Sequence, residues 1–165
     1  MNPRGRVRLI AAPTFPASFK GVTDLTYQFD DFFMRLPARP LAIGLAWTDT
    51  SAFRDSTAEK STNRQAIVRY RVERDTVVNG LPVLVISMKQ QLTLRTTGVD
   101  AQGGRIQSAL DGTDDGIVVF APKAGRLLGR KRTGQLDGQL TMNGPVGEMT
   151  MKQSYSYTNT LDAVK

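Results

Sequence analysis

Residues 67–97 decide the fold, and they read IVRYRVERDTVVNGLPVLVISMKQQLTLRTT. At the start of this stretch, Val68, Tyr70 and Val72 alternate with charged residues, which predicts a half-buried strand with one solvated face. The Asn79-Gly80 dipeptide predicts a two-residue hairpin turn, because both central residues of a type I′ turn need a positive φ. The sequence therefore predicts two antiparallel strands joined by a hairpin.

The strand after this turn is predicted to be long, over residues 81–97. It is apolar on both faces as far as Ile86 and amphipathic beyond that residue, and its length favours a bend or a bulge. We expect Lys89, Gln91 and Arg95 on the solvated face. The inward face is expected to carry Leu84, Ile86, Met88, Leu92 and Leu94.

Turn signals recur through the rest of the chain. They divide it into further expected strands at residues 43–50, 105–110, 117–121, 126–132, 135–142 and 148–158. The expected turns include Asp111-Gly112, Asp115-Gly116, Ala124-Gly125 and Asn143-Gly144. Connections this short join antiparallel neighbours. The predicted fold class is therefore mainly β, an antiparallel meander that forms a half-open or a closed barrel.

One helix is expected before the strands. Leu25, Phe29, Phe32, Phe33 and Leu36 form one apolar stripe at helical spacing, and Pro37 ends it. We expect this amphipathic helix to pack on one face of the sheet. Residues 1–21 are expected to be an irregular N-terminal segment, and residues 22–165 a single β-rich domain.

Composition excludes several kinds of chemistry. The 165-residue chain has a net charge of +7 and contains neither cysteine nor histidine. Disulfides, cysteine nucleophiles, Ser-His-Asp triads and the usual zinc sites are therefore excluded. No stretch approaches the roughly 20 apolar residues of a membrane span. The basic charge favours an anionic partner without choosing among nucleic acid, lipid and acidic polymer.

Two glycine-rich segments partly resemble ion-binding or phosphate-binding loops. Residues 111–116 read DGTDDG and partly match a calcium loop, but Pro122 stands where the closing acid is needed, so we predict a turn. Residues 125–134 read GRLLGRKRTG, with spacing and flanks unlike those of a phosphate loop. They predict a hairpin arm with a solvated basic face, with a phosphate or lipid-headgroup contact as the alternative.

No pattern predicts an enzyme or a nucleic-acid interface. Nothing in the sequence brings two carboxylates together, and we predict no metal and no cofactor. Tyr70 is expected on the face opposite Arg69 and Arg71, which disfavours a basic surface interleaved with exposed aromatic side chains.

Apolar side chains supply the candidate binding residues. Met149, Met151, Tyr155 and Tyr157 share one face of the last strand, interrupted by Gln153. Either core packing or an adaptable ligand surface accounts for this pattern. The candidate ligand-binding residues are Leu92, Leu94, Met149, Met151, Tyr155, Phe29 and Phe33.

Three segments carry a family resemblance: DFFMRLP at residues 31–37, GLAWTDT at residues 44–50 and YRV at residues 70–72. In this order they resemble uncharacterised bacterial envelope proteins whose β-rich shape is loosely similar to the lipoprotein-carrier (Lol-type) half-barrels. The resemblance covers the chain from about Asp24 to its C-terminus. It implies a curved sheet that shelters an apolar ligand under helices, and it implies no catalytic residues.

These observations predict a non-enzymatic, envelope-associated β domain that holds an apolar or lipid-like ligand in a concavity of its sheet. The alternative is a structural or protein-interaction module with a filled core and no small-molecule ligand. A periplasmic or extracellular location is expected from the resemblance. The basic start has an apolar run that stops at Pro13, which predicts an uncleaved start or the edge of a longer chain.

Overall fold

A computed structural model of the protein describes residues 34–99, 103–145 and 147–162. The chain divides into two compact units, Met1–Pro40 and Leu41–Lys165. Residues 34–40 of the first unit are irregular. The expected helix over residues 25–36, with Phe29 and Phe33, lies outside the described residues except for residues 34–36, which are not helical. The described fold is therefore that of the second unit.

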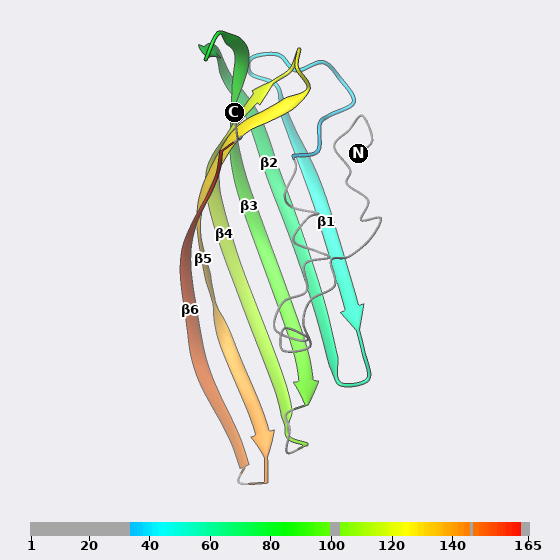
Figure 1. Ribbon diagram of the computed structural model, residues 1–165. Helices are drawn as coiled ribbons and strands as arrows, with labels where there is room; N and C mark the ends of the chain where they lie inside the picture. Colours follow the sequence, from blue (N-terminus) through cyan, green and yellow to red (C-terminus); the bar gives the residue numbers. More distant parts are fainter. Residues whose placement is uncertain (1–33, 100–102, 146, 163–165) are drawn as a thin grey trace, which may run out of the picture. The chain divides into compact units, whose positions relative to one another are not determined.

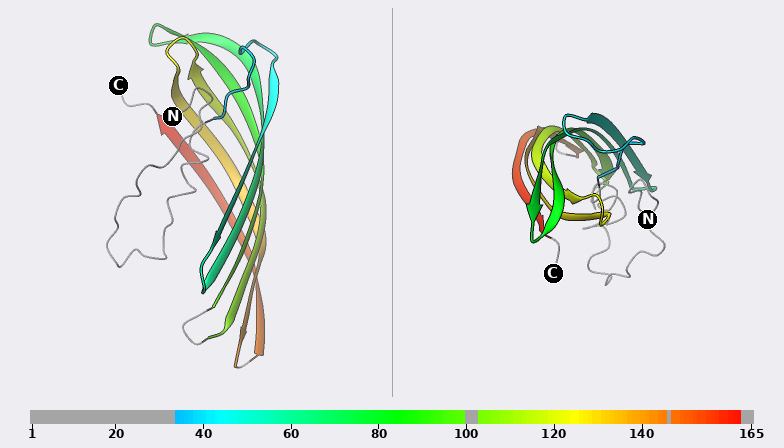
Figure 2. Two further views of the ribbon diagram at one scale, coloured as in Figure 1. Left: turned by 90° about the vertical axis from the view of Figure 1, so that its right-hand side faces the viewer. Right: turned by 90° about the horizontal axis from the view of Figure 1, so that it is seen from above.

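The second unit is one antiparallel sheet of six strands in sequence order (Figure 1). The strands are β1 (Ala46–Ser56), β2 (Lys60–Val78), β3 (Leu81–Val99), β4 (Arg105–Ala121), β5 (Arg126–Gly144) and β6 (Gly147–Asp162). The expected mainly β, antiparallel meander is confirmed. Figure 2 shows that the sheet is twisted and strongly curved. Among the described strands, β1 and β6 pair on one side only, so the sheet is open and the closed-barrel alternative is not confirmed.

The described residues contain no helix. No described segment therefore forms a long apolar helix of the kind that crosses a membrane.

The β2–β3 hairpin forms as predicted. Asn79 and Gly80 have φ angles of 50° and 77°, the left-handed values that a type I′ turn requires. The β2–β3 pairing shifts register between Val72 and Arg74, so the extra residue lies in β2 and not in the long strand β3, where a bend or a bulge was expected. Residues 83–86 of β3 are all buried, which confirms that the strand begins with both faces covered.

The sheet has two different faces. We call the face that carries the buried side chains of Val68, Val72, Ile86, Met88 and Val118 the inner face. The opposite, outer face carries mainly exposed polar and charged residues. The alternation in β2 confirms the prediction for Tyr70, which is buried on the inner face while Arg69 and Arg71 are exposed.

Several predicted turns are wrong. Asp111-Gly112 and Asp115-Gly116 lie inside β4, and the expected strands at residues 126–132 and 135–142 are one strand, β5. Asp and Gly are typical of turns, but here each glycine faces a neighbouring strand that leaves no room for a side chain. Six long strands therefore replace a larger number of short ones.

These glycines form what we call the glycine seam: Gly112 and Gly116 of β4 with Gly134 and Gly138 of β5. Four consecutive inner-face pairs join the two strands, and each contains one glycine. The pairs are Leu110–Gly138, Gly112–Leu136, Asp114–Gly134 and Gly116–Arg132. A Cβ atom at Gly116 would lie 2.5 Å from the carbonyl oxygen of Lys131, and one at Gly138 would overlap that of Ala109. The two backbones therefore approach too closely on this face for two facing side chains.

The seam predicts the effect of Gly138→Ala. The added methyl group meets backbone that cannot turn aside, so we expect a destabilisation of about 1–3 kcal/mol in urea unfolding. Gly144→Ala, on the same strand but with no atom within 4 Å of its added Cβ, is the control and is expected to change stability little. Equal unfolding midpoints for the two variants would contradict the close approach.

Candidate functional site

A cluster of polar side chains lies on the inner face beside the glycine seam. The side chain of Asp114 on β4 is 0% exposed, and its Oδ2 accepts a hydrogen bond from Nη1 of Arg132 on β5 at 3.4 Å. The Tyr157 hydroxyl on β6 donates to Oδ1 of the same carboxylate. The Arg132 guanidinium also lies 5.8 Å from the centre of the Tyr157 ring. We call these three residues, with the nearby Gln90 and Arg130, the polar cluster.

Gly134 makes this arrangement possible. Asp114, Gly134 and Tyr157 occupy one row across β4, β5 and β6. A Cβ atom at Gly134 would overlap Asp114 Oδ1 and lie 2.8 Å from the Tyr157 hydroxyl oxygen. The tyrosine therefore reaches across the middle strand only because that strand has no side chain at this position.

Burial and neighbouring charges shift the acid–base properties of the cluster. Burial, followed by the hydrogen bond to Asp114, raises the pKa of Tyr157 to about 12, although Arg132 and Arg64 oppose the shift. Burial and then the charge of Arg132 lower the pKa of Arg130. The electrostatics show that several guanidinium groups share this part of the inner face.

Gln90 and Arg132 each have a buried donor, Nε2 and Nε, with no hydrogen-bond acceptor among the described residues. Gln90 is only 3% exposed and lies directly opposite Asp114 in the β3–β4 pairing. A buried donor without a partner costs about 1–3 kcal/mol, so each such group requires an explanation.

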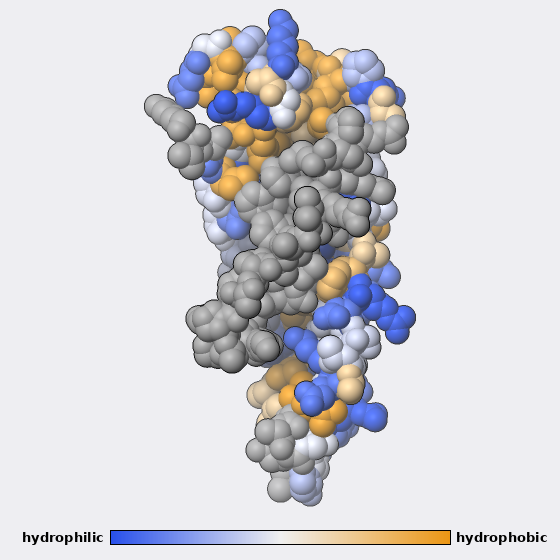
Figure 3. Space-filling view, turned by 45° about the vertical axis from the view of Figure 1, so that its right-hand side comes forward, coloured by the Kyte–Doolittle hydropathy of each residue, from blue (hydrophilic) through white to orange (hydrophobic). Residues whose placement is uncertain are grey.

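Apolar side chains continue the inner face along β5 and β6. We call them the apolar strip: Leu136, Leu140, Met142, Met149, Met151 and Tyr155. Met149, Met151 and Tyr155 are 52%, 39% and 47% exposed, so the core-packing interpretation of these residues is wrong. In Figure 3 a hydrophobic group is visible near the β5–β6 hairpin at the lower end of the view. Core packing would have buried these side chains, so the apolar strip is instead an exposed surface.

The other predicted binding residues lie on the same face. Leu92 and Leu94 are half-buried on the inner face of β3, as predicted, while Lys89, Gln91 and Arg95 are exposed on the outer face. Leu92 shares a row with Gly112, Leu136 and Tyr155. The sheet therefore places the predicted binding residues of β3 and β6 on one face, with β4 and β5 between them; Phe29 and Phe33 lie outside the described residues.

The predicted hairpin arm with a solvated basic face, residues 125–134, is wrong in part. Arg130 is buried and the Arg132 side chain is 18% exposed, while Lys131 between them is exposed on the outer face. The period-2 pattern of Leu136, Leu140 and Met142, extended backwards along β5, would have placed both arginines inside. Sequence reasoning missed Asp114 and Arg132 because the segments containing them were assigned to a turn and to a solvated arm.

The outer face is a network of mutually satisfied polar groups. Arg95 binds both carboxylate oxygens of Asp111 at 2.9 and 2.8 Å, and Thr93 donates to the same carboxylate at 3.0 Å. Lys89 lies 3.9 Å from Asp115. The outward Asp111 and Asp115 therefore face away from Asp114, and the described residues hold no group of three or more metal-ligating side chains.

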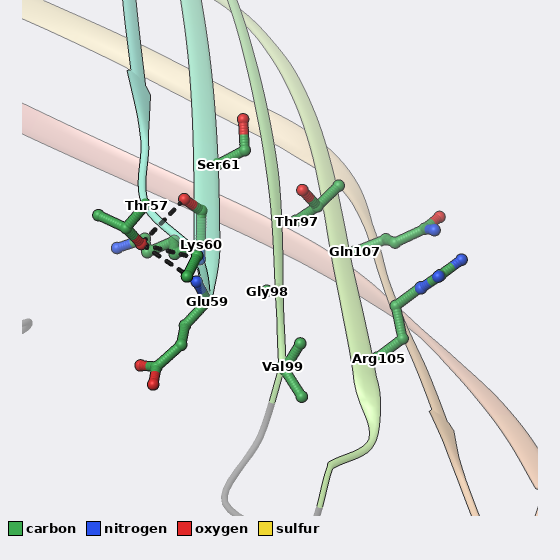
Figure 4. A pocket seen from close by; sticks show the side chains of 10 residues that line it. Thr57, Glu59, Lys60, Ser61, Thr97, Gly98, Val99, Arg105 and Gln107 are labelled. Carbon is green, nitrogen blue, oxygen red and sulfur yellow. Dashed lines mark hydrogen bonds between the residues drawn. The ribbon is translucent and has the colours of Figure 1, made fainter.

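A hollow at the end of the sheet has a structural role. Its volume is about 300 Å³, and it lies where the β1–β2 turn meets the ends of β3 and β4 (Figure 4). The Thr57 hydroxyl donates to the Lys60 carbonyl at 3.2 Å and accepts from the Lys60 amide at 3.0 Å. The Glu59 carbonyl accepts from the Val99 amide at 3.1 Å. These bonds fix the turn to the sheet, while Glu59 and Arg105 point in different directions.

Removal of the Tyr157 hydroxyl tests how much its hydrogen bond to Asp114 contributes to stability. Tyr157→Phe deletes one of two hydrogen bonds to a buried carboxylate, so we expect a loss of about 1.5–3 kcal/mol in urea unfolding at neutral pH. Tyr155→Phe, on the same strand and face but exposed, should change stability by no more than about 0.5 kcal/mol. Equal losses in the two variants would show that the hydroxyl–carboxylate bond contributes nothing.

The shifted pKa of Tyr157 also predicts a pH dependence. Because its folded pKa of about 12 lies above the ordinary value of 10.0, the neutral phenol stabilises the folded state fully below pH 10. This contribution is lost as the pH rises towards 12. The stability difference between the wild type and Tyr157→Phe should therefore shrink over this interval in unfolding curves, and a constant difference would refute the shift.

Comparison of the chain with protein families, with curated proteins and with solved structures found no match in any of the three.

Proposed function

We propose that the inner face binds a long-chain apolar ligand and that the protein acts without catalysis. The observation that carries this proposal is the exposure of Met149, Met151 and Tyr155 on the same face as a buried polar cluster. Exposed apolar surface bordered by polar groups is typical of binding sites. Methionine and tyrosine suit such a surface, because the first adapts its shape and the second tolerates both water and apolar partners.

The dimensions of the apolar strip fit an extended acyl chain. Leu136 and Met142 are six residues apart on β5, which corresponds to about 20 Å along a strand. The acyl chains of one bilayer leaflet span half of a hydrocarbon core of about 30 Å. The strip is thus long enough for one such chain to lie along β5 and β6.

The polar cluster supports a binding role over a catalytic one. The Asp114 carboxylate is engaged by Arg132 and by Tyr157, and the phenol holds its proton up to about pH 12. The phenol is therefore not poised to act as a base near neutral pH.

The test is native mass spectrometry of the protein purified from cells, together with displacement of a fluorescent long-chain fatty acid. We expect a co-purifying lipid and saturable displacement at micromolar concentrations. The double variant Met149→Asn/Met151→Asn places amides under the ligand and should weaken binding at least about tenfold, which is 1.4 kcal/mol. Thr150→Asn, between the two methionines but on the outer face, is the matched control and should bind like the wild type.

The open edge of β6 favours a second candidate, a protein-interaction module. Among the described strands, this 16-residue strand pairs only with β5, and an unpaired edge is a template for strand addition. Absence of lipid and of saturable displacement would overturn the ligand proposal and leave this alternative.

A further inference from the structure

We propose that the polar cluster binds an oxyanion at one end of the ligand, so that the bound molecule is a long-chain anionic amphiphile. This inference rests on the proposed function, because it adds a headgroup site to the apolar strip. The chemistry recognised is a carboxylate or a phosphate attached to an acyl chain, received by Arg132 and Gln90.

Arg132 has the geometry to receive a second anion. Its Nη1 donates to Asp114, whereas its Nε is buried without an acceptor in the described part of the chain. A guanidinium carries five donors in a planar fork, and two of them fit one carboxylate or phosphate. The Arg132 side chain is 18% exposed, whereas that of Asp114 is fully buried, so an incoming anion can reach the guanidinium but not the carboxylate.

Gln90 supplies an independent sign of a missing partner. Its Nε2 is a buried donor with no acceptor among the described residues, and its side chain is on the same face as Arg132. Both flank the carboxylate of Asp114, from β3 and from β5. Two buried donors that lack acceptors in the described part of the chain therefore lie on two different strands beside one carboxylate.

The local charge favours an anion over a cation. Arg64 and Arg132 both act on Tyr157, and Arg132 also acts on Arg130, so three guanidinium groups lie within electrostatic reach of the cluster, whose rows contain the carboxylates of Asp49 and Asp114. The charge of Arg132 also lowers the pKa of Arg130, which shows that these two cations repel one another. A bound anion relieves this repulsion, and in a buried setting such charge–charge terms are strong.

The headgroup site and the apolar strip are contiguous. Arg132 and Leu136 are four residues apart on the inner face of β5, or about 14 Å along the strand, and Tyr157 and Tyr155 are adjacent inner-face positions on β6. An amphiphile anchored at Arg132 would therefore place its chain along Leu136 and Tyr155, in the direction of Leu140.

The experiment compares three ligands with the same acyl chain on the full-length protein: hexadecanoate, hexadecyl phosphate and hexadecanol. Displacement of a fluorescent fatty acid should show that at least one of the two oxyanions binds about tenfold or more tightly than the alcohol, as expected for charge-assisted hydrogen bonds. The tighter of the two oxyanions identifies the source of the headgroup. Arg132→Gln should reduce this preference to about twofold or less while leaving the affinity for the alcohol unchanged.

Lys131→Gln is the matched control, because it removes the same charge from the neighbouring residue on the outer face. It should keep the preference. Gln90→Met is a second test in case Arg132→Gln does not fold. It replaces an unsatisfied amide by an apolar group of similar volume, so the variant should fold. It should still lose part of the preference for the oxyanions over the alcohol.

The outcomes separate the two proposals. Equal binding of acid, phosphate and alcohol by the wild type would overturn the headgroup site and leave the apolar ligand standing. An unchanged preference in Arg132→Gln and in Gln90→Met would also overturn it. Binding of none of the three ligands would overturn the proposed function itself.

Discussion

Between β4 and β5, each of four successive inner-face pairs holds a single side chain, because the backbones approach too closely for two. The glycines alternate between the strands, so the remaining side chains Leu110, Leu136, Asp114 and Arg132 also alternate. The glycines let the two backbones lie close on this face while the pairing of the strands stays continuous. The seam sets the shape of the inner face and decides which side chains can meet across it.

The polar cluster is a direct product of the seam. A buried carboxylate is stable only when hydrogen-bonded and paired, and the row through Gly134 lets Asp114 receive Tyr157 from two strands away. Gly116, on the same strand as Asp114, pairs with Arg132, so no side chain stands opposite the arginine on β4. Removal of one partner would leave the carboxylate under-satisfied, so the glycines, the acid and its donors form one interdependent unit.

Local signals predicted the strands and the first hairpin, but not their lengths. Asn79 and Gly80 are residues that tolerate positive φ, and the alternation of apolar and charged residues around Tyr70 is typical only of a half-buried strand. Both the turn and the strand were therefore predictable from the sequence. Asp111-Gly112 and Asp115-Gly116 have the composition of turns, and only the neighbouring strand explains glycine there without a turn. Recognition of the site required the continuity of β5, because Arg132 joins Leu136 on one face only if no turn separates them.

The contrast between the two faces is the strongest reason to place function on the inner one. On the outer face, cross-strand groups satisfy one another, as Arg95, Thr93 and Asp111 do, and such exposed pairs need no further partner. On the inner face, where unsatisfied groups cost more, Gln90 and Arg132 retain buried donors without acceptors, and Met149 and Met151 remain exposed. The buried donors without acceptors and the exposed Met149, Met151 and Tyr155 lie on one surface, whereas the exposed Ile67 and Ile117 of the outer face have no such donors beside them among the described residues. A single molecule with an anionic end and an apolar chain would satisfy the donors of the inner face and cover its exposed apolar side chains.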